Sequence, residues 1–124
     1  MIQYKMQRDK GVLVVKPQGP LTQEDFAALS RETGEYITAQ GALNGFVICT
    51  PKFPGYKNVQ GLLAHLKFVR KHHRHIKKLA FVSDSRFYKI AARWVNRFIR
   101  PTVKHFPGRD ESAALDWMGA PGGH

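Results

Sequence analysis

The hydrophobic and polar positions of this chain follow two periods, and the changes of period mark the predicted elements. Apolar residues at alternate positions within 1–8, a turn, and a continuous apolar run at 12–15 predict an antiparallel β-hairpin. Further strands are predicted at 43–50 and at 79–82, where apolar runs recur, and at 102–106, where apolar residues alternate. The hairpin therefore precedes three more strands.

Between these strands, apolar residues recur at three- and four-residue spacing and predict helices. Thr22, Asn58 and Ser85 stand where a capping side chain is needed, and a short final helix follows Asp110. The core stripe expected for the second helix is Val59, Leu62, Leu63, Leu66 and Val69. The core face expected for the third helix is Phe87, Ile90, Ala91, Trp94 and Phe98.

The order of elements predicts the fold class. A hairpin followed by alternating helices and strands and a closing helix gives a single α/β domain over 1–118, with a mixed sheet. The segment 119–124 is rich in Gly and Pro, and we expect a flexible tail. The loop after the strand at 43–50 lies at the carboxyl end of that strand, where open α/β sheets usually bind ligands.

Charge is distributed unevenly along the chain. The formal net charge is +11, and Asp84 is the only acid between Tyr36 and Arg109. A basic middle of this kind indicates an anionic partner, self-association through opposite faces, or a well-solvated surface. The chain has a single cysteine, no signal-peptide pattern and no apolar run near the ~18 residues of a membrane span, so we expect a cytoplasmic protein.

The sequence offers no set of catalytic residues. Cys49 ends an apolar strand and is interpreted as an inert core thiol. Asp84 and Ser85 are interpreted as a helix cap, and neither a nucleophile elbow nor a Walker loop is present. We therefore expect no enzyme and no cofactor.

A histidine cluster is the one candidate metal site. His72, His73 and His75 lie close together, but Lys and Arg residues surround them and would repel a cation. We interpret the cluster as a solvated helix end whose charge complements the helix dipole, and we expect no metal.

Two basic stripes are the strongest candidate binding surface. They are Lys67, Arg70, Lys71 and Arg74 on the second helix, and Arg86, Lys89, Arg93 and Arg97 on the third. If the two helices lie side by side, the stripes merge and face an anionic surface. Five contacts at about 1 kcal/mol each give about 5 kcal/mol, a dissociation constant of only roughly 0.1–1 mM, so an apolar wedge or a bound lipid has to add to the charge.

Several local motifs resemble the SpoIIAA-like branch of the STAS (sulfate transporter and anti-sigma antagonist) family. They are the segments 19–22, 53–56, 79–84 and 111–117, in the order and spacing of that family. The resemblance implies a STAS-type fold and a non-enzymatic module that binds partners, membranes or small apolar ligands. With that resemblance, the residues expected to border an apolar ligand are Phe53, Pro54, Gly55, Tyr56, Asn58, Phe87 and Trp94.

The chain departs from the true anti-sigma antagonists in one loop. Those proteins carry an Asp-Ser pair before the helix that follows the third strand, and the Ser is phosphorylated. The loop 52–58 contains neither residue, which puts the phosphorylation switch in doubt.

The leading hypothesis is a binding or regulatory module that takes a small apolar or lipid-like ligand and associates with an anionic membrane surface. One alternative is a protein–protein regulator with an acidic partner, similar to anti-sigma factor antagonists. Another is a non-specific nucleic-acid binder, since the basic stripes could contact phosphates but no base-reading motif is present. A homodimer is compatible with each.

Overall fold

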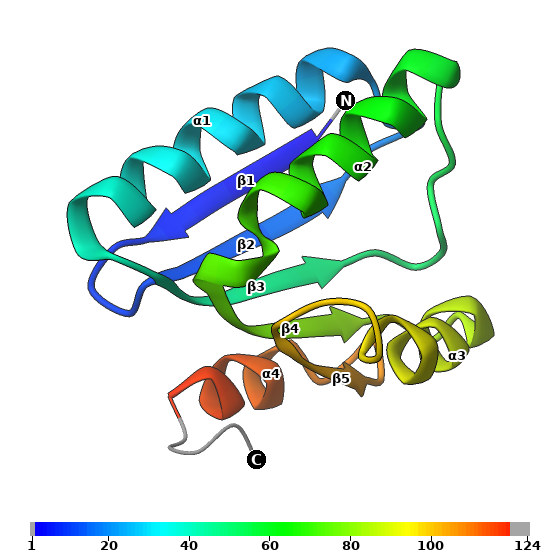
Figure 1. Cartoon of the computed structure of the whole chain (residues 1–124). Helices are drawn as coiled ribbons and strands as arrows, with labels where there is room; N and C mark the ends of the chain where they lie inside the picture. The colour runs from blue at the N-terminus through cyan, green and yellow to red at the C-terminus, as the bar shows by residue number, and fades with distance from the viewer. Residues whose placement is uncertain (1, 120–124) are drawn as a thin grey trace.

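The computed structural model describes residues 2–119 and contains a five-stranded sheet with four helices (Figure 1). The elements are β1 (Ile2–Gln7), β2 (Val12–Pro17), α1 (Gln23–Gln40), β3 (Leu43–Cys49), α2 (Val59–His72), the 3₁₀ turn η1 (His73–His75), β4 (Ile76–Val82), α3 (Arg86–Val95), β5 (Thr102–Phe106) and α4 (Glu111–Met118). Of the tail expected at 119–124, all but Gly119 lies outside the described residues.

The strands follow one another in sequence order across the sheet. β1 is antiparallel to β2, and every other neighbouring pair is parallel. The mixed sheet, the amino-terminal hairpin and the α/β class are therefore confirmed. The hairpin turn requires Gly11, whose φ is +67° and where a Cβ atom would lie 2.7 Å from the Tyr36 hydroxyl.

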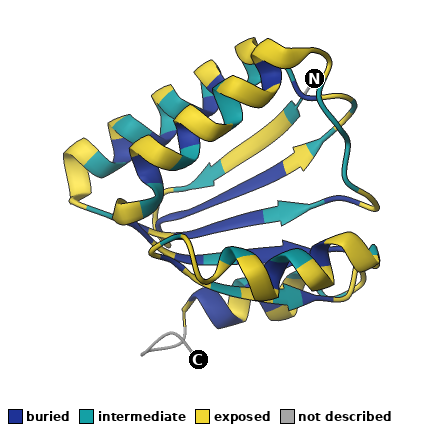
Figure 2. Cartoon of the chain, turned by 45° about the vertical axis from the view of Figure 1, so that its right-hand side comes forward, coloured by how far each residue is buried: buried dark blue, intermediate teal, exposed yellow. Residues whose placement is uncertain are grey.

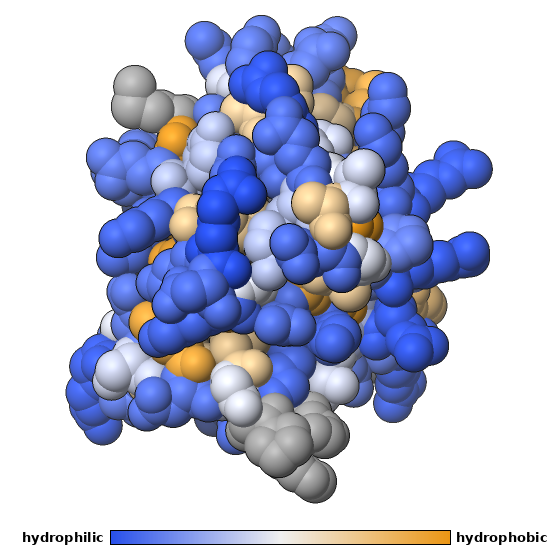
Figure 3. Space-filling view, turned by 90° about the vertical axis from the view of Figure 1, so that its left-hand side faces the viewer, coloured by the Kyte–Doolittle hydropathy of each residue, from blue (hydrophilic) through white to orange (hydrophobic). Residues whose placement is uncertain are grey.

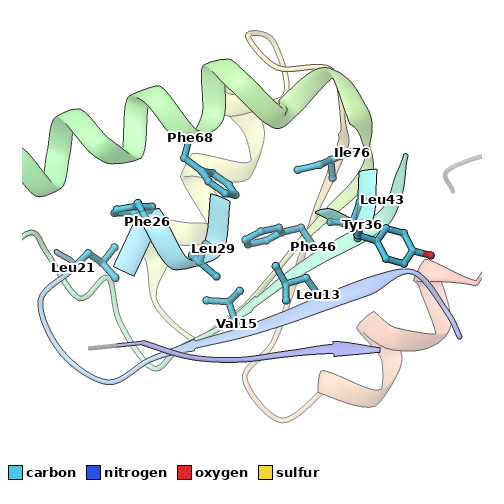
Figure 4. Close-up of a cluster of buried hydrophobic side chains, with 10 residues drawn as sticks. All are labelled: Leu13, Val15, Leu21, Phe26, Leu29, Tyr36, Leu43, Phe46, Phe68 and Ile76. Carbon is cyan, nitrogen blue, oxygen red and sulfur yellow. The ribbon is translucent and has the colours of Figure 1, made fainter. Parts of the chain in front are cut away.

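Helices cover both faces of the sheet. α1, α2 and α3 lie on the face that carries Leu13 and Phe46, and α4 lies on the face that carries Val12 and Val47 (Figures 1 and 4). Strand side chains alternate between faces, so a strand covered on both sides needs apolar residues at every position. This explains the continuous apolar run at 12–15, which is buried throughout (Figure 2).

The predicted caps are confirmed. The Thr22 hydroxyl accepts from the amide of Asp25, whose carboxylate accepts from the amide of Thr22, which completes a capping box. Asn58 caps α2 and Ser85 caps α3 through their side-chain oxygens. Capping residues therefore located the helix starts well.

The core stripe predicted for α2 is wrong. Val59, Leu62, Leu63 and Leu66 are exposed, and Val69 is half-buried. The buried residues of α2 are instead Gly61, Phe68 and His72. Gly61 sets this orientation, because a Cβ atom there would lie 2.5 Å from the carbonyl oxygen of Leu21. The helix thus packs through its smallest residue and leaves its leucines outside.

The core face predicted for α3 is wrong in the same way. Phe87, Ile90, Trp94 and Phe98 are 51–78% exposed, and Ala91 is half-buried. The buried residues are Tyr88 and Ala92, and the Tyr88 ring lies 5.0 Å from the ring of Phe81 on β4. α3 also ends at Val95, so Phe98 lies in the turn that follows.

Candidate functional site

The loop between β3 and α2 brings aromatic rings together at the carboxyl edge of the sheet. The ring of Phe53 lies 5.5 Å from that of Tyr56 and 4.9 Å from that of Phe87. Tyr88 lies 6.4 Å from Phe53 on the inner side. Three predicted ligand-site residues, Phe53, Tyr56 and Phe87, therefore form one cluster.

Backbone hydrogen bonds hold this loop against the start of α1. The amide of Leu21 donates to the carbonyl of Gly55 (2.8 Å), and the amide of Lys57 donates to the carbonyl of Leu21 (2.9 Å). The Tyr56 hydroxyl is hydrogen-bonded to Nδ1 of His65 at 2.7 Å. Burial raises the pKa of Tyr56 and lowers that of His65, so both groups are neutral at pH 7.

The other residues predicted for the ligand site do not belong to this aromatic cluster. Pro54 and Gly55 are half-buried in the same loop. The Asn58 side chain accepts from the amide of Gly61 at 3.0 Å and so serves as a helix cap. Trp94 lies two helical turns beyond Phe87 on α3, is 55% exposed, and has the Arg97 guanidinium 5.0 Å from its ring centroid.

Large apolar side chains are exposed on the outer sides of two helices, α2 and α3, which Figure 2 shows as mostly exposed. We call this set of side chains the outer apolar surface. Its residues are Val59, Leu62, Leu63 and Leu66 of α2 with Phe87, Ile90, Trp94 and Phe98 of α3 and the turn after it. Among residues 2–119, only Tyr4 is a large exposed hydrophobic elsewhere. A cluster of this kind is typical of an interaction site.

The predicted basic residues flank this surface and do not merge into one patch. On α3, helical spacing places Arg86, Lys89 and Arg93 on the side away from Phe87 and Trp94. The remaining basic residues of the two stripes are Arg97, after the end of α3, and Lys67, Arg70, Lys71 and Arg74. Lys67 and Lys71 lie on the α1 side of the outer apolar surface and the α3 cations on its other side, whereas Arg70, one turn after Leu66, lies within it.

The α2 stripe divides along the helix. Lys67 and Lys71 face the groove between α1 and α2, whereas Arg74 lies in η1 at the amino edge of the sheet. That edge is largely hydrophilic where it faces the viewer (Figure 3). Arg74 thus lines a different cavity from Lys67 and Lys71.

Comparison with known proteins identifies the family. The SpoIIAA-like family model matches residues 12–119. The chain belongs to the SpoIIAA-like family. A protein of uncharacterised function from Shewanella loihica PV-4, of the DUF3478 family and with a SpoIIAA-like fold, superposes with a TM-score of 0.74. It is 24% identical, and the match covers 95% of this chain and 92% of that one. No curated protein matches.

The SpoIIAA-like assignment confirms the family resemblance and the fold. The likeness to the solved structure shows the fold alone. Within residues 2–119, none of the helices combines the length and the apolar character needed to cross a membrane.

The thiol of this SpoIIAA-like chain is poorly suited to nucleophilic chemistry. Burial and the neighbouring Glu111 raise the pKa of Cys49 to about 12, against a weaker opposing effect of Lys16. The thiol is thus protonated at neutral pH. Cys49 is half-buried at the end of β3, as an inert thiol at the margin of the core would be.

The histidine cluster is solvated at His75, as predicted, but not at His72. His72 is only 3% exposed, and its Nε2 lies 2.8 Å from the Ser30 hydroxyl. Nδ1 of His73 accepts from the amide of Arg100 at 3.0 Å. Burial, with Lys71 and His75 nearby, lowers the pKa of His72. The described part of the chain contains no group of three or more His, Cys, Asp or Glu that could hold a metal ion.

The Asp84–Ser85 pair has two separate roles. Ser85 caps α3, as predicted, whereas the Asp84 carboxylate accepts from the amide of Gly108 at 2.9 Å and holds the loop between β5 and α4. Both side chains are thus engaged in local structure.

Proposed function

We propose that this protein is a cytoplasmic, non-enzymatic binding module that attaches reversibly to an anionic membrane surface and takes a small apolar or lipid-like ligand at the carboxyl edge of its sheet. The observation that carries the proposal is the outer apolar surface with cations on both of its sides. Interfacial helices combine these two features, an apolar face and basic residues beside it.

The apolar side chains supply the free energy that charge alone lacks. Fully burying a Leu, Ile or Phe side chain is worth about 1.5–3 kcal/mol, so four partly inserted side chains contribute about 4 kcal/mol. Added to about 5 kcal/mol from five basic residues, the total of about 9 kcal/mol corresponds to a dissociation constant near 1 µM or slightly below. Trp94 and Phe98 have the amphipathic or apolar rings suited to the headgroup boundary.

Charge complementarity favours a membrane over a second copy of the chain. In a twofold-symmetric dimer the same surface meets itself, so the basic flanks of one copy face those of the other. With a net charge of +11 this arrangement is repulsive, whereas an anionic bilayer attracts the same flanks.

The ligand part of the proposal rests on the cluster of Phe53, Tyr56 and Phe87. The Phe53 ring lies 5.5 Å from that of Tyr56 and 4.9 Å from that of Phe87, at the edge where open α/β sheets bind ligands. Phe87 is 51% exposed and belongs to the outer apolar surface, so a lipid-like molecule in the membrane has a continuous apolar path to this edge.

The test is co-sedimentation with vesicles of phosphatidylcholine containing phosphatidylglycerol, at low and high salt. We expect wild-type protein to bind and the Leu66→Ser/Trp94→Ser variant to lose at least tenfold in affinity. Tyr4→Ser is the matched control, because it removes an exposed apolar ring outside the surface and should bind like wild type. Equal binding by all three proteins would refute the role of the outer apolar surface.

The partner classes separate in the same experiment. Wild-type protein that stays in solution with every vesicle contradicts the proposal. A stoichiometric protein partner retained at high salt then favours the protein–protein regulator. Binding to any nucleic acid without sequence preference favours the non-specific nucleic-acid binder. Mass spectrometry of gently purified protein tests the ligand, because an apolar molecule is expected to copurify.

A further inference from the structure

A groove runs between α1 and α2, beside the outer apolar surface. Both helices start at the carboxyl edge and lie side by side, pointing the same way (Figure 1). The hydrogen bond between Ser30 and His72 joins them near the amino edge. The groove has a volume of about 490 Å³. The side chains that matter for its chemistry are Gln23, Phe26, Arg31, Leu63, Lys67 and Lys71.

Three cations line this groove, and no acid does. Arg31 projects from α1, and Lys67 and Lys71 project from α2 one turn apart. Within residues 2–119, none of the three makes an ion pair. Like charges held together in this way repel one another, and a bound anion would relieve the repulsion.

The acids of α1 do not line the groove. Glu32 pairs with Arg8 of the hairpin turn at 3.5 Å. Glu35 lies one helical turn after Arg31 and Glu24 two turns before it, so both are on the side of α1 that carries Arg31, although neither lines the groove. Glu32 is thus directed toward the hairpin, and the groove itself is lined by Arg31 without any carboxylate.

The groove is apolar beneath its cations and opens beside the outer apolar surface. Phe26 and Phe68, whose ring centroids are 6.2 Å apart, lie buried at its base. Leu63 lines the groove and is also 57% exposed as part of the outer apolar surface. A bilayer in contact with that surface would therefore bring headgroups to the mouth of the groove.

We propose that the groove between α1 and α2 binds the phosphate of one anionic phospholipid through Arg31, Lys67 and Lys71. This inference rests on the proposed membrane attachment and names the lipid chemistry that it selects. A guanidinium fork and two ammonium groups from facing helices match the oxygens of a tetrahedral phosphate, which point in several directions at once. The glycerol and the first acyl carbons lie against Leu63, which distinguishes a lipid from free phosphate.

The experiment compares two double variants that remove the same charge. Lys67→Gln/Lys71→Gln empties the groove of two cations, and Lys89→Gln/Arg93→Gln removes two from the far side of α3. Vesicles contain phosphatidylcholine with either phosphatidylglycerol or an equal surface charge from oleate. We expect the groove variant to bind phosphatidylglycerol vesicles at least tenfold more weakly than the α3 variant does, and both variants to bind oleate vesicles equally.

Amide chemical shifts distinguish the sources of phosphate. With short-chain phosphatidylglycerol, the amides around Arg31, Lys67 and Lys71 should shift and saturate at lower concentration than with inorganic phosphate. Equal losses in both variants would overturn the lipid site, and so would equal saturation by inorganic phosphate. If wild-type protein binds vesicles while these tests fail, membrane attachment stands without the groove. If wild-type protein binds no vesicle, the proposed function fails first.

Discussion

α1 and α3 cover the same face of the sheet and use their apolar residues in opposite ways. α1 buries Phe26, Leu29 and Tyr36 and presents carboxylates to solvent. α3 buries only Tyr88 and Ala92 and exposes its larger apolar residues. α1 uses its amphipathic pattern for folding, and α3 keeps its pattern available for a partner. An apolar stripe at helical spacing therefore predicts a helix without saying which face turns inward.

The largest expected effect is on the buried side of this comparison. Leu29 is 2% exposed, so Leu29→Ala should lower the free energy of unfolding by about 2–5 kcal/mol through lost burial and a residual cavity. Urea unfolding followed by circular dichroism measures the change. A loss below about 1 kcal/mol would mean that α1 contributes as little packing as the outer side of α3.

A smaller loss is expected at the start of α1. Thr22→Ala removes the hydroxyl that accepts from the Asp25 amide, while the Thr22 amide can still donate to the Asp25 carboxylate, and the change should cost about 1 kcal/mol. Thr22→Ser keeps the hydroxyl and is the matched control. If the two variants unfold at the same urea concentration, the capping box does not stabilise α1.

Acid should weaken the α1 side of the molecule first. Burial lowers the pKa of His72, beside Ser30, and of His65, stacked on Phe26, below the usual 6.5. Below pH 6.5 the unfolded chain then binds more protons than the folded one, so stability is complete above that pH and falls as the pH drops through the folded-state pKa values.

Urea unfolding at a series of pH values measures this dependence. His72→Gln cannot titrate and can still hydrogen-bond to Ser30, so it should flatten the curve between pH 7 and 5. An unchanged slope in this variant would show that His72 is not responsible. Hydrogen exchange should show α1 and α2 losing protection before α3.

The smallest effect on stability is expected on the exposed side of α3. Ile90 is 56% exposed, so Ile90→Ser should change the free energy of unfolding by no more than about 0.5 kcal/mol while it weakens vesicle binding. Urea unfolding and co-sedimentation measure the two quantities on one sample. A destabilisation as large as that of Leu29→Ala would show that α3 uses its apolar face for folding after all.

The sequence predicted the elements well because each has a local signal. These signals act over a few neighbouring positions. They are the turn residues, the caps at Thr22, Asn58 and Ser85, and the strands with apolar residues at every position. The order of these elements then predicted an α/β fold with a mixed sheet, and the family motifs agreed with it; the structure and the family match confirm both.

The orientation of α2 and α3 could not be predicted, because distant residues decide it. The close approach of Gly61 to the Leu21 carbonyl links positions forty residues apart. The burial of His72 depends on Ser30 of another helix. One signal was present in the sequence. Gly61, Phe68 and His72 are spaced seven and four residues apart and so share one face of α2, but the leucine stripe was the stronger pattern. The groove beside Arg31 was missed because its cations come from two helices.

Leu21 determines how the loop between β3 and α2, at the carboxyl edge of the sheet, can open. Its amide and its carbonyl both bond to the loop that carries Phe53, on either side of Tyr56. Lifting that loop must break both bonds together, so the edge is expected to open in one step and not by gradual bending. The amides of Leu21 and Lys57 should then exchange with solvent at matching rates, and an occupant lodged beneath the loop should slow both by the same factor.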